Sequence, residues 1–173
     1  MFGAWLLHGS EAMMFEIHFD GACEPKNPGG IATCGWVIYH EGGLKRKRIA
    51  SGHKVVKEGE GATNNYAEWC ALGLALRWLL DNKKDECAAQ SIVIIGDSQL
   101  VINQLAGKWE CKAENLQPLK ARCLEILDSL NFQARSARWV PREQNEEADA
   151  LSKKAYTERT GQQAPERRKK KKA

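Results

Sequence analysis

MFEIHFD at residues 14–20 and SIVIIGD at residues 91–97 decide the expected fold. The first stretch alternates apolar and polar side chains, which predicts a strand. The second is almost continuously apolar, which predicts a strand buried on both faces, as in the parallel part of a sheet. We therefore expect two adjacent parallel strands, each ending at an aspartate, Asp20 and Asp97.

The remaining periodic segments extend this pair into a larger sheet. Lys45–Arg48 is a run of four basic residues, and a strand of that charge density suits a sheet edge. Three strands followed by alternating helices and strands predict an α/β fold, with one mixed five-stranded sheet flanked by helices. Three of its strands would be antiparallel and two parallel. The predicted strands cover residues 14–20, 32–40, 44–55, 91–96 and 132–140, and the predicted helices cover residues 64–80, 98–105, 116–130 and 145–156.

The basic charge of the protein is concentrated in its C-terminal tail. The 173 residues are 43% hydrophobic and 28% charged, which excludes collagen-like, wholly disordered and multispan membrane proteins. Residues 158–173 carry a net charge of +5, so the rest of the chain contributes −1 to the total of +4. We predict an N-terminal extension over 1–13, one domain over 14–157 and a disordered basic tail over 158–173. The tail either solubilises the protein or attracts phosphates.

The cysteines and the apolar segments indicate a cytoplasmic protein. None of the six cysteines forms a CxxC or CxxH pair, which argues against a zinc site and favours reduced, buried thiols. No apolar run approaches about 18 residues, so we expect no transmembrane helix. The apolar N-terminal segment lacks basic residues, so we expect no signal peptide. A cytoplasmic monomer without a membrane partner is the resulting expectation.

Four acidic residues stand where a metal site would form. Asp20 and Asp97 end the two central strands, and Glu68 and Asp149 lie early in helices beside apolar residues. Each alone has a plain alternative role, either in a turn or at the positive end of a helix dipole. Together, beyond the carboxyl ends of strands, they predict an oxygen-only cage suited to Mg²⁺ or Mn²⁺. Two such ions about 4 Å apart would clamp a phosphodiester during in-line displacement.

Six short segments surround these acids: FDGAC (19–23), NPGG (27–30), TNNYAE (63–68), GDSQ (96–99), VP (140–141) and EADAL (147–151). They resemble type 1 ribonuclease H (ribonuclease HI), and the resemblance covers about residues 14–157. The resemblance implies the ribonuclease H-like fold and an endonuclease that hydrolyses the RNA strand of RNA/DNA hybrids, leaving 3′-hydroxyl and 5′-phosphate ends. It implies Asp20, Glu68, Asp97 and Asp149 as ligands of two Mg²⁺ ions with substrate bound, Mn²⁺ being a substitute.

The resemblance also implies residues that contact the nucleic acid. Amide side chains both donate and accept hydrogen bonds, as the RNA 2′-hydroxyl does in return. Thr63 matches a DNA-phosphate pocket at a helix N-terminus, where free N–H groups attract anions. Trp109 is a candidate for stacking on the DNA strand, with packing against the sheet as the alternative. The residues implied to read the minor groove and the 2′-hydroxyls are Asn27, Asn64, Asn65 and Gln99.

The sequence departs from many bacterial members of this family at three places, one of which is Glu24-Pro25-Lys26 in the loop before Asn27. The loop before the last helix lacks their histidine, and Arg142 or Glu143 is the candidate to replace it. There is also no long basic protrusion after residue 107, and together these features resemble an archaeal-like branch. The expected partner is an RNA/DNA hybrid, with double-stranded RNA as a further candidate substrate. The alternatives are a DNA nuclease of the same superfamily and a non-catalytic hybrid-binding module.

Overall fold

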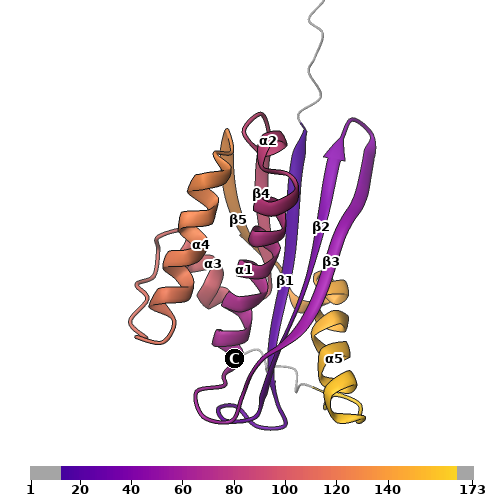
Figure 1. Cartoon of the computed structure of the whole chain (residues 1–173), viewed down its shortest axis with the longest axis vertical. Coiled ribbons are helices and arrows are strands. Elements are labelled where there is room, and N and C mark those ends of the chain that lie inside the picture. The colour runs from indigo at the N-terminus through magenta and orange to yellow at the C-terminus, as the bar shows by residue number, and fades with distance from the viewer. Residues whose placement is uncertain (1–12, 167–173) are drawn as a thin grey trace, which may run out of the picture.

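The computed structural model describes residues 13–166, which form a five-stranded sheet with helices packed on it (Figure 1). The strand order is β3-β2-β1-β4-β5, antiparallel from β3 to β1 and parallel from β1 to β5, as predicted. The strands are β1 (Met14–Glu24), β2 (Ile31–Gly42), β3 (Lys45–Glu58), β4 (Ser91–Gly96) and β5 (Ala134–Trp139). The helices are α1 (Asn64–Asn82), α2 (Lys84–Cys87), α3 (Gln99–Leu105), α4 (Gln117–Leu130) and α5 (Glu146–Thr160), with a 3-10 turn η1 (Arg142–Gln144).

The first strand is longer than predicted. Its parallel pairing with β4 ends where Phe19 lies opposite Gly96. On the other side, β2 continues to pair with it as far as Glu24 opposite Ile31, so β1 does not end at Asp20. That detail of the prediction is wrong because it considered only one neighbour of the strand. Asp20 nevertheless lies directly beyond the parallel pairing, next to the end of β4.

The two faces of the sheet carry different helices. The apolar core lies on one face, where Phe15 and Ile17 of β1 pack with residues of α1 and α4. Successive strand residues point to opposite faces, and Gly35 of β2, between two core residues, faces α5 instead. In Figure 1, α1 and α4 lie in front of the strands, whereas α5, which packs on the opposite face, is seen at the lower right next to β3. The basic strand β3 is at the sheet edge, as predicted.

The last helix passes the predicted domain boundary at residue 157 and continues to Thr160. Two residues assigned to the tail by the sequence pair with β3 and hold this last turn in place. His53 Nε2 lies 2.9 Å from a Glu158 carboxylate oxygen, and Arg159 Nε lies 2.6 Å from Glu58 Oε1. Apart from Met13 and residues 158–166, the predicted extension and tail lie outside the described residues.

The structure also bears on the predictions about the cysteines and about transmembrane helices. All six cysteines are free thiols, and five of them are buried. Over residues 13–166, no helix combines the length and the apolar character that crossing a membrane needs.

Glu16 is a buried acid on β1 at the centre of a polar cluster. His18 and Arg46 both hydrogen-bond its carboxylate, and the Arg46 guanidinium lies 3.3 Å from the centroid of the Tyr39 ring. Burial acts to raise the pKa of Glu16, but the hydrogen bonds and charges of His18 and Arg46 outweigh it and hold the pKa at about 2. Ionised Glu16 therefore stabilises the fold above its usual pKa of 4.5, and this stabilisation is lost as the pH falls toward 2.

We expect Glu16→Gln to lower the free energy of unfolding at pH 6 by at most about 3 kcal/mol, the equivalent of this pKa shift reduced by the solvent around Arg46. The difference from the unsubstituted protein should shrink as the pH falls from 4.5 to 2. Urea unfolding at pH 6, 4 and 3 measures it, with the exposed Glu60→Gln as control. A difference that stays the same at all three pH values would contradict this origin of the stability.

Candidate active site

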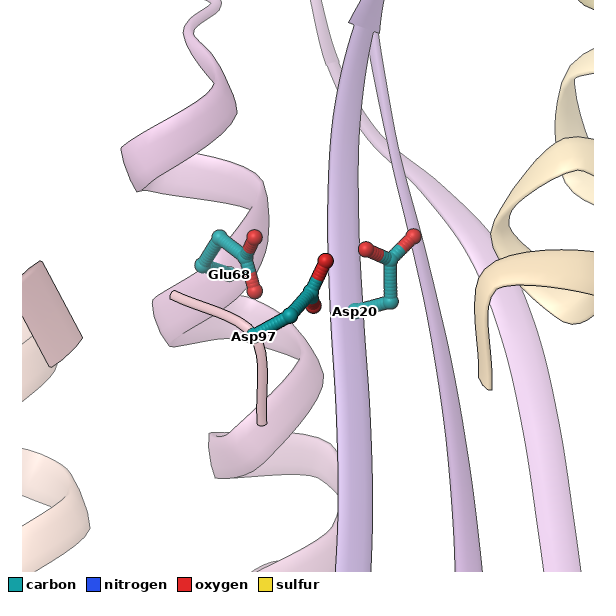
Figure 2. Close-up of side chains that lie close together, drawn as sticks. All are labelled: Asp20, Glu68 and Asp97. Atoms are coloured by element: carbon teal, nitrogen blue, oxygen red, sulfur yellow. The ribbon is translucent and has the colours of Figure 1, made fainter. Parts of the chain in front are cut away.

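Three carboxylates from distant parts of the sequence meet at the end of the parallel strands. Asp20 lies on β1, Glu68 on α1, and Asp97 directly after β4. Each offers an oxygen, and these oxygens all lie within 4.8 Å of one another. In Figure 2, Asp97 lies between Glu68 on one side and Asp20 on the other. The structure thus brings together three of the four predicted metal ligands in one group.

Two glycines let the helices approach the strands closely enough to build this group. A Cβ atom on Gly21 would lie 2.2 Å from the backbone nitrogen of Glu68, so only glycine lets α1 lie directly on β1. Gly35, opposite Asp20 in β2, does the same for α5, because its Cβ would lie 2.5 Å from the Ser152 nitrogen. The sheet backbone therefore sets the positions of the side chains that both helices contribute.

The group has the chemistry of a divalent cation site. Burial raises the pKa of Asp97, and the neighbouring charge of Asp20 raises it further, while a hydrogen bond from Asn145 opposes the shift. Such clustered acids are costly to hold ionised unless a cation neutralises them. The donors are carboxylate oxygens, which suit Mg²⁺ or Mn²⁺ better than softer metals. The residues present therefore fit the predicted kind of ion.

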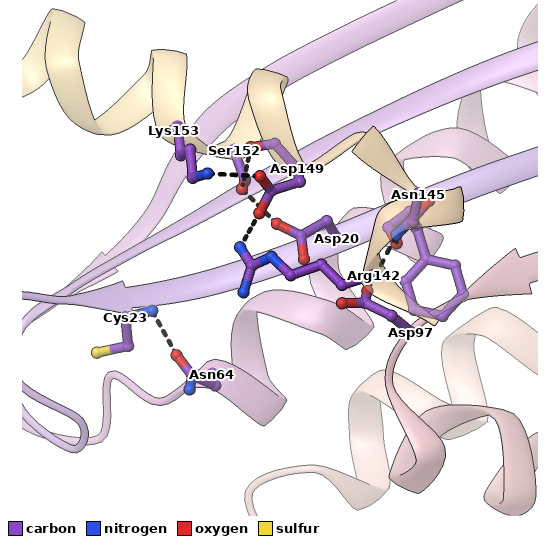
Figure 3. Close-up of polar contacts among 10 residues, drawn as sticks. Asp20, Cys23, Asn64, Asp97, Arg142, Asn145, Asp149, Ser152 and Lys153 are labelled. Atoms are coloured by element: carbon purple, nitrogen blue, oxygen red, sulfur yellow. Dashed lines mark hydrogen bonds and ion pairs between the residues drawn. The ribbon is translucent and has the colours of Figure 1, made fainter. Parts of the chain in front are cut away.

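Asp149 lies beside this group but has different partners. It is buried near the start of α5, where Arg142 pairs with one carboxylate oxygen and Lys153 Nζ lies 2.6 Å from the other. Ser152, one turn further along α5, donates a hydrogen bond to Asp20 (Figure 3). The carboxylate of the fourth predicted ligand is therefore paired with two cations, and Ser152 links the helix that carries it to Asp20.

Asn145 connects the loop before α5 to the central strands. Asn145 is only 2% exposed, and its side-chain amide donates to the Phe19 carbonyl at 2.8 Å and to Asp97 Oδ1 at 3.0 Å. The sequence predicts Asn145 as the cap of the last helix, and Asn145 is the N-cap residue of α5. Its side chain makes no capping hydrogen bond, because the amide is turned toward Asp97 instead (Figure 3).

Four of the residues predicted to contact nucleic acid lie around the start of α1, and Gln99 lies at the start of α3. The Asn64 backbone N–H donates to Asn27 Oδ1 at 3.1 Å, and Asn64 Oδ1 accepts from the Cys23 N–H at 2.6 Å. Thr63 caps the helix by accepting a hydrogen bond from the Tyr66 N–H at 3.0 Å, as its sequence position predicts. Asn65 and Gln99 are exposed at the starts of α1 and α3.

The residues named as auxiliary candidates lie in different surroundings. Arg142 pairs with Asp149, whereas Glu143 is exposed in η1. Trp109 is 48% exposed in the segment after α3. Trp139, which the sequence analysis did not single out, is 44% exposed and donates from Nε1 to the Asp97 carbonyl at 3.1 Å.

A protein family described as reverse transcriptase-like matches residues 18–155, most of the chain. The chain belongs to this family. Ribonuclease HI of Halobacterium salinarum is 39% identical over 139 residues, which are 80% of this chain and 62% of that protein. The chain thus spans somewhat less than two thirds of the length of that relative.

Solved structures of similar proteins agree with this family membership. The crystal structure of RNase H1 from Halobacterium salinarum has a TM-score of 0.70 and 34% identity, covering 84% of this chain and 98% of that chain. The structure of LC11-RNase H1 in complex with an RNA/DNA hybrid has a TM-score of 0.71 and 25% identity. The match covers 85% of this chain and 98% of that chain. The predicted resemblance to type 1 ribonuclease H and the predicted fold are confirmed. The archaeal-like branch stays a prediction.

Several of the residues that contact and orient the acids were not among the site residues predicted from the sequence. Ser152 meets Asp20 because α5 lies directly on Gly35, and Lys153 meets Asp149 one turn earlier on the same helix. Their spacing of three and four residues from Asp149 places them on the same helix face, and this is the signal that could have found them. Trp139 could have been found from its position at the end of β5, where it lies opposite Gly96, the residue before Asp97.

Proposed function

We propose that this protein is an endonuclease that hydrolyses the RNA strand of RNA/DNA hybrids, leaving 3′-hydroxyl and 5′-phosphate ends. The observation that carries the proposal is the group of Asp20, Glu68 and Asp97 at the end of the parallel strands. Support comes from the similarity to ribonuclease HI and to an RNase H1 structure that contains an RNA/DNA hybrid. The cysteines, all free, fit a reducing cytoplasm, where we propose that the protein acts as a monomer.

Asp20, Glu68, Asp97 and Asp149 would hold two Mg²⁺ ions with substrate bound, or Mn²⁺ in their place. When bound, such ions activate water and stabilise the charge that develops on phosphate oxygens. The protein supplies the arrangement of the acids. Ser152 and Asn145 orient Asp20 and Asp97, and Arg142 and Lys153 pair with the Asp149 carboxylate.

The proposed substrate contacts follow from the polar groups around α1. Thr63 stands at the start of this helix, where backbone N–H groups attract a phosphate of the DNA strand. Asn27, Asn64, Asn65 and Gln99 would meet the minor groove and the RNA 2′-hydroxyls, which a DNA duplex lacks. Trp109, half-exposed after α3, would stack on the DNA strand.

A cleavage panel with end-labelled RNA/DNA, RNA/RNA and DNA/DNA duplexes tests the proposal in Mg²⁺, Mn²⁺ and chelator. We expect cleavage of the RNA strand of the hybrid with either metal, none with chelator, and 3′-hydroxyl RNA ends. Preferential cleavage of DNA/DNA would favour the DNA nuclease, and hybrid binding without turnover would favour the binding module. The RNA/RNA lane decides whether double-stranded RNA is also a substrate. RNA ends with 2′,3′-cyclic phosphate would exclude a water nucleophile.

Arg142 and Glu143 are the two candidates to replace the loop histidine, and only Arg142 is seen to contact Asp149. We expect Arg142→Gln to lower kcat for hybrid cleavage about 10-fold, because groups that orient a ligating carboxylate have effects of this size. Glu143→Gln is the matched control in the same turn, since Glu143 is exposed. Steady-state kinetics at saturating Mg²⁺ measures both variants. Equal losses, or a larger loss for Glu143→Gln, would reverse the assignment.

The basic end of the chain is proposed to attract the hybrid rather than to take part in the reaction. Deletion of residues 161–173 removes six Lys or Arg residues and leaves α5 whole. We expect weaker binding at low salt and a shallower slope of log affinity against log salt, by roughly 0.9 for each phosphate that the deleted residues neutralise. The rate at saturating hybrid should change little. An unchanged slope would leave the residues only a solubilising role.

A further inference from the structure

A groove separate from the acidic group runs over the outer surface of α1. Its volume is about 360 Å³, and it lies between α4 on one side and β3 on the other. Figure 1 shows α1 in front of the sheet with these two elements at its sides. Apolar residues of all three elements line it, among them Val56, Leu74 and Ile126. This size and lining are within the range of pockets that bind small molecules.

Gly73 forms part of the floor of the groove, although nothing in the fold requires glycine there. A Cβ on residue 73 would meet only the Cys123 sulfur, at the ordinary contact distance of 3.5 Å. Glycine in the middle of a helix is less favourable than alanine, because it loses more conformational freedom on folding. The chain thus has a helix-weakening residue at the point where any side chain would begin to fill the groove.

The charge of the groove is one-sided. Lys54, Arg77 and Arg122 are part of its lining, and within residues 13–166 that lining contains no acidic side chain. Arg77 Nε lies 2.8 Å from Asp81, and Arg122 lies 3.1 Å from Glu125, but all four side chains are about half exposed or more. Ion pairs this exposed contribute little, so a bound anion can replace these acids at small cost.

We propose that this groove is a binding site for a small organic anion with a large apolar body. The apolar body of the ligand would lie along Gly73 and Leu74, and its anionic group would face Lys54 and Arg122. The negative carboxylate group around Asp97 would repel such a ligand, whereas the three cations of the groove would attract it. The site does not depend on hybrid cleavage, and its test uses no nucleic acid.

Two fluorescent probes that differ by one charged group test the proposal on the full chain. The anion 8-anilinonaphthalene-1-sulfonate should bind with a stoichiometry of one, and its neutral analogue N-phenyl-1-naphthylamine should bind more weakly. Replacing Lys54 and Arg122 together by Gln should weaken binding of the anion about 3- to 10-fold, the expected worth of two exposed charge contacts, and leave the neutral probe unchanged. Equal binding of both probes would overturn the preference for an anion.

Gly73→Leu should weaken binding of both probes about 10-fold or more, because it excludes apolar surface of the ligand from the groove. Gly73→Ala is the matched control, and we expect a higher melting temperature with a smaller loss of binding. In the unsubstituted protein, the sulfonate should shift the amide resonances of residues 73–77 and 122–126 in ¹H–¹⁵N spectra. Unchanged probe binding by folded Gly73→Leu, or amide shifts centred elsewhere, would overturn the site.

Discussion

Asp97→Asn should abolish cleavage of RNA/DNA hybrids, with a loss of about 10³-fold or more, while the protein stays folded. Asp97 contributes one of three oxygens that lie within 4.8 Å of one another. Asparagine has nearly the same shape, but its neutral amide holds a divalent ion poorly, so the stabilisation of developing phosphate charge is lost. The oxygen of the substituted amide could still accept the hydrogen bond from Asn145, so the loop before α5 should keep its position.

The stability of this variant supplies an independent check on the same residue. Burial and the charge of Asp20 raise the pKa of Asp97, so its ionised form is less favourable in the folded than in the unfolded chain. A raised acid pKa means that stability decreases as the pH rises through it. Without divalent ions at pH 7, Asp97→Asn should therefore melt at the same temperature or higher than the unsubstituted protein.

Asp85→Asn provides the matched control, because it makes the same chemical change at an exposed position of α2. It should leave both the cleavage rate and the melting temperature nearly unchanged. Near-normal turnover by folded Asp97→Asn would remove the acidic group from the mechanism. A large drop in its melting temperature in chelator would show instead that ionised Asp97 stabilises the fold.

The features of the fold that follow local periodicity could be predicted from the sequence. The apolar run of β4 specifies a central strand with the bounds Ser91–Gly96, and the alternation of β1 specifies its neighbour. Once these two are parallel and adjacent, Asp20 and Asp97 must lie close together at the end of their pairing. The extension of β1 to Glu24 could not be read in this way, because it depends on pairing with β2 rather than on local pattern.

The residues that support the acids depend on how closely elements distant in sequence approach one another. Whether the Asn145 side chain bonds the start of α5 or Asp97 depends on the path of the turn η1, a short 3-10 element with no periodic pattern. Ser152 reaches Asp20 only because Gly35 lets α5 lie on β2. An asparagine before an acidic helix start has the same sequence signal in both arrangements, so the signal cannot separate them.

Asn145→Ala should damage both the fold and the reaction, for separable reasons. Removing the amide leaves the buried Phe19 carbonyl without this donor, which costs roughly 1–3 kcal/mol of unfolding free energy. It also removes the hydrogen bond that lowers the pKa of Asp97, so that pKa should rise further above its usual range. Since residues that orient a ligating carboxylate change activity 10- to 100-fold, we expect kcat at pH 7 to fall by about 10²-fold.

The pH dependence of cleavage distinguishes a positioning role from a merely structural one. If Asn145 keeps Asp97 ionised, the acidic limb of the kcat profile should move to higher pH in Asn145→Ala, and raising the pH should recover part of the lost rate. Asn82→Ala is the control, because Asn82 also donates its amide to a backbone carbonyl, at 2.8 Å, but at the surface of α1. Measurements well below the melting temperature of the variant keep unfolding out of the rates. A rate loss with an unshifted profile would mean that Asn145 affects the rate without controlling the ionisation of Asp97, because its contact with Asp97 is the one that links it to the ionisation of the acidic group.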